Sequence, residues 1–218
     1  MNLFNLPDST KVEKIIPKNA FDAYTNAKQK KLFADLVSRI TWLNKVSPET
    51  INLAGKEVKE IQIFFIELKA KKEIQLLLDI IDKAIPYQII FIVNYSDIVY
   101  LSTSAKHVHA INENNAVIDW TFKTSWFSAN ENKYIIHLTK NIDAVYSDFC
   151  FQLSDKVNAK NKKLQELITD EKQINSLRKD ILKLKANIGK CKQFKQKVEL
   201  NLQLKYIEEK LHILLNEK

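Results

Sequence analysis

One apolar segment of the chain reads Ile61-Gln62-Ile63-Phe64-Phe65-Ile66-Glu67-Leu68. Its β-branched and aromatic residues are almost uninterrupted, which is typical of a central strand buried on both faces. Apolar residues at helical spacing follow over residues 71–84, and a second buried strand is expected over residues 87–95. Two buried strands on either side of one helix predict a parallel, right-handed βαβ unit.

The chain continues this pattern beyond the second strand. Apolar and β-branched residues predict further strands over residues 98–104 and 117–126. Asn141 or Asp143 is expected to cap a helix that runs to Leu153. Together these elements predict the α/β fold class, with a small mixed sheet and flanking helices.

The residues before the first buried strand predict mainly helices. A short helix is expected over residues 11–16, where Pro17 ends it, and a second helical segment over residues 18–24. A longer helix is expected to end at Ser47-Pro48, because the residue before a proline avoids helical geometry. A short strand is then expected over residues 51–53. The long helix is predicted from apolar residues at spacings of three and four, namely Leu32, Phe33, Leu36, Val37, Ile40 and Leu43.

Residues 154–218 predict a helical arm that is separate from a body formed by residues 1–153. A 3-4 alternation typical of a coiled-coil seam covers Ile174, Leu177, Ile181, Leu184 and Ile188. A second apolar helix is indicated by Phe194, Val198, Leu204, Ile207, Leu211 and Leu214. Gly189 is expected to end the first helix in left-handed geometry, so that the two helices form a hairpin. The alternative is one long helix paired with another chain, which would bring Lys195 and Lys205 into the seam.

The positive charge of the chain is concentrated on the arm. Residues 154–218 contain 16 Lys and Arg against 9 Asp and Glu, whereas residues 1–153 contain 18 against 17. Such a field attracts polyanions, so we expect the arm to contact nucleic acid or an acidic partner protein. The expected contact residues are Lys156, Lys160, Lys162, Lys163, Arg178, Lys179, Lys183, Lys185, Lys190, Lys192, Lys195 and Lys197.

Arginine is scarce, which limits the kind of recognition that this surface predicts. Only Arg39 and Arg178 occur, against 32 lysines. Bidentate reading of guanine relies mainly on arginine, so any nucleic-acid binding should be non-specific and directed at phosphates.

Composition excludes several other classes of function. The chain has only 2 glycines, too few for a glycine-rich phosphate loop, and no Gly-x-Ser-x-Gly motif. No apolar run reaches the roughly 20 residues of a membrane span, and the first residues do not resemble a signal peptide. We therefore expect a cytoplasmic protein with reduced cysteines, no membrane contact and no cofactor. His107 and His109 would share a strand face if the strand predicted over residues 98–104 extended that far, but without a third ligand no metal site is expected.

One pair of residues predicts a catalytic alternative. Glu67 and Lys69 end the first buried strand in a Glu-x-Lys pattern that resembles the edge of the restriction-endonuclease-like nuclease fold. Residues two apart on a strand share a face, so this pair is expected to hold Mg²⁺ and a water if the alternative is right. That fold also needs an aspartate from the preceding strand, and the sequence offers no clean match. We therefore expect an interaction protein rather than an enzyme.

Several short motifs resemble a bacterial family of domains of unknown function. They are Leu6-Pro7 with Thr10, Ile16-Pro17-Lys18, Ser47-Pro48-Glu49-Thr50-Ile51-Asn52, Glu60-Ile61-Gln62-Ile63 with Glu67-Leu68-Lys69, Ile85-Pro86-Tyr87, and Lys192-Gln193-Phe194 with Lys197-Val198-Glu199-Leu200-Asn201. Members of that family are often encoded beside DNA methyltransferases and helicases of restriction or phage defence. The resemblance implies an accessory protein with such an enzyme as partner. A purely structural oligomerisation module is a further alternative, and the oligomeric state stays open.

Overall fold

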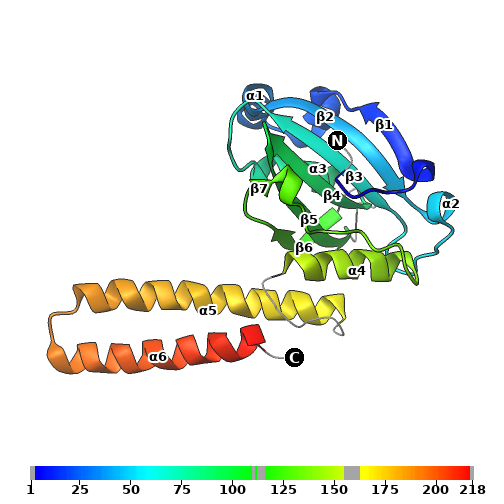
Figure 1. The fold of residues 1–218 in the computed structure, drawn as a ribbon. Helices are drawn as coiled ribbons and strands as arrows, with labels where there is room; N and C mark the ends of the chain where they lie inside the picture. Colours follow the sequence, from blue (N-terminus) through cyan, green and yellow to red (C-terminus); the bar gives the residue numbers. More distant parts are fainter. Residues whose placement is uncertain (1–2, 110, 112–115, 155–162, 217–218) are drawn as a thin grey trace. The chain divides into compact units, whose positions relative to one another are not determined.

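The computed structural model describes the whole chain except residues 1–2, 110, 112–115, 155–162 and 217–218 (Figure 1). The chain divides into two compact units, Met1–Leu153 and Ser154–Lys218. We call the first unit the body and the second the arm, and describe each by itself. The predicted α/β class is confirmed, because a mixed sheet with flanking helices is accompanied by a C-terminal helical hairpin.

The described residues of the body form short 3-10 helices, four α-helices and seven strands. In chain order they are η1 Asp8–Thr10, β1 Lys11–Ile15, η2 Lys18–Tyr24, α1 Ala27–Leu36, β2 Val37–Val46, α2 Pro48–Ile51, β3 Ile61–Leu68, α3 Gln75–Ala84, β4 Gln88–Tyr95, β5 Ile98–Val108, β6 Ala116–Lys123, β7 Phe127–Ser128, η3 Ala129–Glu131 and α4 Ile142–Leu153.

The strands form one mixed sheet in the order β1-β2-β3-β4-β5-β6, with β7 paired to β5. Strands β3 and β4 are parallel, with Phe64 opposite Phe91, and α3 is the connection between them. All other pairs described are antiparallel. The predicted parallel βαβ unit is therefore confirmed.

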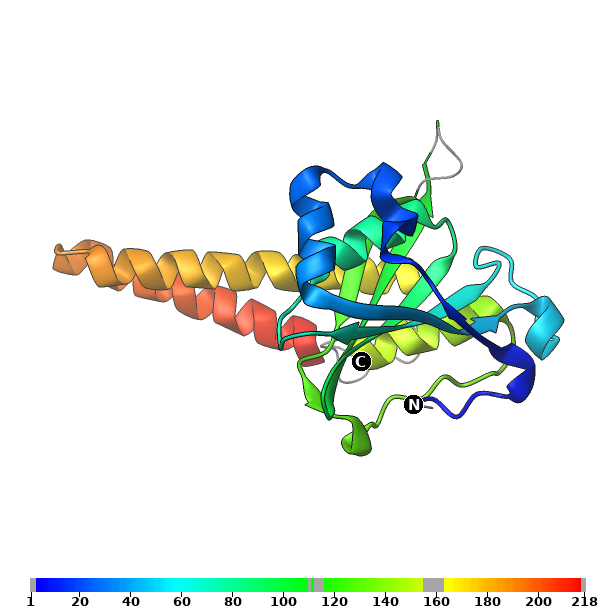
Figure 2. The ribbon, with the colours of Figure 1, turned by 90° about the horizontal axis from the view of Figure 1, so that it is seen from above.

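Helices α1 and α3 lie on the same side of the sheet (Figure 2). Their apolar residues form one core cluster with those of β3 and β4, including Phe33, Leu77, Ile81, Phe64 and Phe91. The apolar residues of α3 recur at helical spacing, so they lie on one face of the helix. That face is buried in the core cluster.

Helix α4 contributes a second group of buried residues. The hydroxyl groups of Tyr146 and Thr103 are 3.0 Å apart, and the Thr103 hydroxyl donates to the Ile89 carbonyl. Phe149 packs edge-on against Phe4, with 5.5 Å between ring centroids. Burial raises the pKa of Tyr146 and of the free thiol of Cys150, so both groups stay uncharged in the core.

The helix predicted over residues 11–16 is wrong, because this segment is strand β1. It pairs antiparallel with β2, and a register shift between Lys11 and Lys14 contains the positive φ of Glu13. Thr10 anchors the start of the strand by accepting a hydrogen bond from the Asn44 side chain. Pairing with a distant strand thus overrides a weak local preference for helix.

The long helix predicted across residues 32–43 is also wrong. Helix α1 ends at Leu36, and Val37 begins strand β2. Register shifts interrupt the pairing of β2 with β3, so the fully buried Val37 and Ile40 are three residues apart instead of two or four. Such bulges add a residue to the strand and here imitate helical spacing.

The segment around Ser47-Pro48 begins a helix and does not end one. Ser47 and Thr50 form a reciprocal capping box for the short helix α2, with the proline in its first turn. Asn52 then ends α2 in left-handed geometry at φ 52°. The strand predicted over residues 51–53 is therefore wrong.

Of the two residues predicted as alternative caps of α4, Asn141 is the cap. Asn141 accepts a hydrogen bond from the Ala144 amide and caps the helix. The Asp143 carboxylate instead accepts from the amides of Lys56, Glu57 and Val58 and holds that loop against α4. Partial burial opposes ionisation of Asp143, but these three donors outweigh it and lower its pKa.

A buried ion pair connects α3 to β5. The Lys106 ammonium donates to the Asp82 carboxylate at 3.0 Å and to the carbonyls of Asp82 and Ile85 at 2.8 Å each. Both side chains are 0% exposed. Burial lowers the pKa of Lys106 and raises that of Asp82, so each charge depends on the other for its stability.

Removing one member of this pair should destabilise the body strongly. We expect Lys106→Met to lower the free energy of unfolding by about 3–5 kcal/mol, because Asp82 and two carbonyls lose their donor in the core. Urea unfolding followed by circular dichroism measures this change. The double variant Lys106→Met with Asp82→Leu should recover part of the loss, since no isolated carboxyl group then remains. A single variant as stable as the unchanged chain would contradict the argument.

The arm consists of helices α5, Leu164–Lys190, and α6, Phe194–Asn216, which fold back on each other (Figure 1). The predicted hairpin is confirmed. Its seam buries Ile174, Leu177 and Leu214, against which Ile207, Leu211 and Leu215 pack. In the part of the chain that the structure describes, no helix is both long and apolar enough to cross a membrane.

The predicted role of Gly189 is wrong. Helix α5 continues through Gly189 to Lys190, and neither glycine of the chain has a positive φ. The reversal lies at residues 191–193, where Cys191 is extended and its amide donates to the carbonyls of Asn187 and Ile188. Extended backbone after the last turn therefore ends the helix without a left-handed residue.

Replacing Gly189 with Ala should consequently stabilise the hairpin. A Cβ at this position meets no atom within 4 Å, and alanine in a helix interior is favoured over glycine by about 1 kcal/mol. We expect Gly189→Ala to raise the thermal unfolding midpoint without changing the oligomeric state in light scattering. A longer, reassociated helix or a loss of stability would contradict this geometry.

Candidate functional site

The turn of the hairpin gathers the lysines that the sequence places on two different helices. Residues 183–198, which we call the hairpin tip, contain six lysines and no acidic residue. All six are exposed: Lys183, Lys185, Lys190, Lys192, Lys195 and Lys197. Because α5 and α6 fold back on each other, the last turns of one lie beside the first turns of the other. The tip is therefore a concentrated positive surface.

Only part of this charge is compensated. Lys185 pairs with Glu208 on the facing helix at 2.9 Å, and Lys183 lies 3.5 Å from Asp180. Among the described residues, no ion pair reaches the other four lysines of the tip. The uncompensated charge thus lies closest to the turn.

The start of α6 carries charges of the sign that a helix start disfavours. Its first turn contains no acidic residue, and Lys195 and Lys197 lie near its free amide groups. Those amides carry partial positive charge, which a cation opposes and an anion stabilises. The lysines of the first turn therefore repel the partial positive charge of the amides, and a bound anion would offset this repulsion.

The remaining predicted contact residues lie away from the tip or outside the described structure. Lys163 directly precedes α5, and Arg178 and Lys179 lie in its middle; all three are exposed. Lys156, Lys160 and Lys162 lie outside the described residues. The turn of the hairpin thus brings together six of the twelve predicted contact residues.

The predicted catalytic pair lies at the end of β3, but each member has another partner. Glu67 pairs with Arg39, which is directly opposite it on β2. The Lys69 ammonium donates to the carbonyl of Ala34 at 2.7 Å. Lys69 also follows the last residue of β3, so the strand alternation that would put it beside Glu67 no longer applies.

The described residues around Glu67 include no second carboxylate on the paired strand or in the adjoining groove. Glu67 lies within a helix-strand-helix-strand order, α2-β3-α3-β4, that is compatible with the nuclease fold. However, the neighbouring strand β2 supplies the guanidinium of Arg39 where the nuclease fold would supply a second carboxylate. The groove beside it, of about 510 Å³, is lined by further basic and apolar residues such as Lys18 and Ile15. Among the described residues, no group of three His, Cys, Asp or Glu could hold a metal ion.

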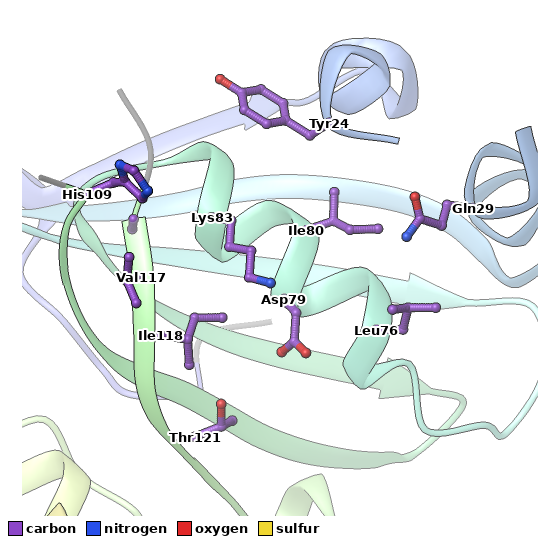
Figure 3. A pocket seen from close by; sticks show the side chains of 11 residues that line it. Tyr24, Gln29, Leu76, Asp79, Ile80, Lys83, His109, Val117, Ile118 and Thr121 are labelled. Carbon is purple, nitrogen blue, oxygen red and sulfur yellow. The ribbon is translucent and has the colours of Figure 1, made fainter. Parts of the chain in front are cut away.

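A larger groove of about 650 Å³ lies between α3 and β6 (Figure 3). Helix α3 contributes Leu76, Asp79, Ile80 and Lys83. The opposite sides are lined by Tyr24, Gln29, His109, Ala116, Val117, Ile118 and Thr121. Sequence reasoning missed this groove, because its residues come from four separate segments. Asp79 accepts a hydrogen bond from Gln75, and the hydroxyl groups of Thr121 and Ser104 lie 3.0 Å apart.

The histidine pair is also separated by its contacts. His107 lies 2.9 Å from the carboxylate of Asp119 on β6, whereas His109 accepts a hydrogen bond from the Ile111 amide. Neither histidine belongs to a cluster of metal ligands among the described residues.

A model of a protein family, described as a domain of unknown function (DUF4391), matches residues 4–211. The chain belongs to the DUF4391 family. The match covers nearly all of the body and the hairpin, so both units are part of the family's domain. No curated protein and no solved structure shows significant similarity to the chain.

The ion pair of Glu67 with Arg39 leads to a prediction about catalysis. We expect no cleavage of plasmid, single-stranded DNA or RNA by the purified DUF4391 chain with Mg²⁺ or Mn²⁺, because a single paired carboxylate holds a hydrated divalent ion poorly. Gel electrophoresis after incubation with and without metal measures this. Metal-dependent cleavage that Glu67→Ala and Lys69→Met both abolish, in variants that still fold, would establish the nuclease alternative instead.

Proposed function

We propose that this DUF4391 chain is an accessory protein that binds the phosphate backbone of nucleic acid through its hairpin tip. The single observation that carries this proposal is the gathering of six exposed lysines, without an acidic residue, around the turn between α5 and α6. Four of these lysines have no ion-pair partner among the described residues. They are therefore available to a polyanion without first losing a protein contact.

The chemistry of the tip favours phosphate over base edges. Lysine presents a compact ammonium on a flexible stem, so it neutralises a phosphate without fixing the orientation of a base. Each phosphate neutralised on duplex DNA releases a condensed counterion and contributes about −0.9 to the slope of log K against log salt. Binding by the tip is thus expected to be sequence-tolerant and steeply salt-dependent.

A partner enzyme would supply the sequence choice and the reaction. The resemblance noted above points to a DNA methyltransferase or a helicase as that partner. The tip would then add non-specific affinity for the DNA on which the enzyme works, and such added affinity raises the occupancy of a linked complex. An acidic surface of the partner protein is the competing target of the same lysines.

Removing charge from the tip should weaken nucleic-acid binding. We expect the triple variant with Lys190, Lys192 and Lys197 changed to Gln to reduce the salt slope on a 30-base-pair duplex by about 2.7, since three phosphate contacts are lost. Affinity in 50 mM salt should fall by roughly 100-fold. Fluorescence anisotropy over a series of salt concentrations measures both quantities.

A matched control removes the same charge from the body. Lys28, Lys71 and Lys72 are also exposed and have no ion-pair partner among the described residues, and changing all three to Gln should leave the affinity within about twofold. Equal losses in both variants would show that net charge alone matters and would refute a site at the tip. Unchanged duplex binding by the tip variant, together with lost binding to a methyltransferase or helicase, would assign the lysines to the partner protein.

A further inference from the structure

Helix α6 has a second apolar face that does not pack against α5. Phe194, Val198, Leu202 and Tyr206 follow one another at intervals of four residues, and we call them the outer stripe. All four are exposed, with Leu202 at 65% and Tyr206 at 68%. Ile213 continues the same side of the helix and is also exposed. Spacing of this kind places side chains on one side of a helix.

The outer stripe is distinct from the seam of the hairpin. The seam residues of α6 are Ile207, Leu211, Leu214 and Leu215, which pack against α5. At 3.6 residues per turn, this set lies on the opposite side of α6 from the outer stripe. Helix α6 is therefore apolar on two sides, and the hairpin uses only one of them.

Two charged residues interrupt the outer stripe in a symmetric way. Lys195 lies seven residues before Leu202, and Glu209 lies seven residues after it. Val198 and Tyr206 lie four residues before and after the same leucine. Because seven residues are close to two turns, both charges lie on nearly the same side of the helix as Leu202.

This symmetry is what an antiparallel pair of identical helices requires. If two copies of α6 cross at Leu202, Val198 of each faces Tyr206 of the other, and Lys195 of each faces Glu209 of the other. In a parallel pair, Lys195 would face Lys195 and Glu209 would face Glu209. Opposite charges stabilise the first arrangement and like charges oppose the second.

We propose that the outer stripe of α6 pairs with the outer stripe of a second copy of this chain, antiparallel and centred on Leu202. The contact is isologous, since the same surface serves both partners. It goes beyond the proposed nucleic-acid function and does not rest on it. Lys190, Lys192 and Lys197, which test the tip, and Leu202, which tests the contact, each belong to one proposal only, whereas Lys195 belongs to both the tip and the contact.

A matched pair of leucines tests where the copies meet. Leu202 and Leu182 are exposed to 65% and 68%, but Leu182 lies on α5, outside the outer stripe. Sedimentation equilibrium should show a dimer of the unchanged chain at tens of micromolar. Leu202→Lys should weaken it by about 100-fold or more, because two charges would be buried against each other. Leu182→Lys should leave it unchanged. A monomeric unchanged chain, or a dimer insensitive to Leu202→Lys, would overturn the proposal.

Exchange of the two embedded charges tests the orientation. Lys195→Glu and Glu209→Lys should each weaken the dimer, because each creates two contacts between like charges. The double variant should restore it, since the opposite charges then face each other again with their positions exchanged. In a parallel pair, neither single change would remove an attraction and the double variant would gain nothing. Single variants that dimerise as well as the unchanged chain would therefore refute the antiparallel arrangement. Circular dichroism checks that all these surface variants keep their helical content.

Discussion

The body depends on the ion pair between Lys106 and Asp82. A fully buried lysine and carboxylate are costly unless each satisfies the other, and here the ammonium also binds two carbonyls at the end of α3. The pair therefore fixes the crossover helix to strand β5 with a definite orientation. Strand β5 lies next to β4 in the sheet, so the pair links the crossover helix to the strand that follows the βαβ unit. Apolar packing alone would leave the helix freer to slide along the sheet.

In the arm, different residues provide the stability and the positive charge. Apolar contacts such as those of Ile174, Leu177 and Leu214 hold α5 and α6 together. The short turn at residues 191–193 then brings the lysines of both helices to one end. Charge repulsion among them opposes the hairpin, so the seam must outweigh it. A bound polyanion would attract these lysines, so their charge would then stabilise the hairpin.

Strand pairing determines the chemistry available at Glu67. The sequence shows a Glu-x-Lys pattern at the end of a buried strand, which is compatible with metal binding. Whether a second carboxylate lies nearby depends on the register of β2 against β3. That register puts Arg39 opposite Glu67, and an arginine neutralises the carboxylate that a metal ion would need. The register of β2 against β3 thus makes Glu67 a member of an ion pair.

Local periodicity was sufficient wherever an element is long and buried on a consistent face. Strand β3 over Ile61–Leu68, the βαβ unit and the pairing of α5 with α6 follow from the spacing of apolar residues in the sequence. Phe194 and Val198 are exceptions, because the sequence groups them with the apolar residues of the second helix and the structure exposes both. Strand β2, which contains bulges, could not be predicted in this way. Its register shifts place Val37 and Ile40 at helix-like spacing, so the sequence pattern indicated a helix. The partners of Glu67, Asp143 and Lys106 are also decided by the tertiary structure. The reason is that each is separated from its partner by more than twenty residues, and only the register of the sheet and the packing of α3 and α4 bring them together.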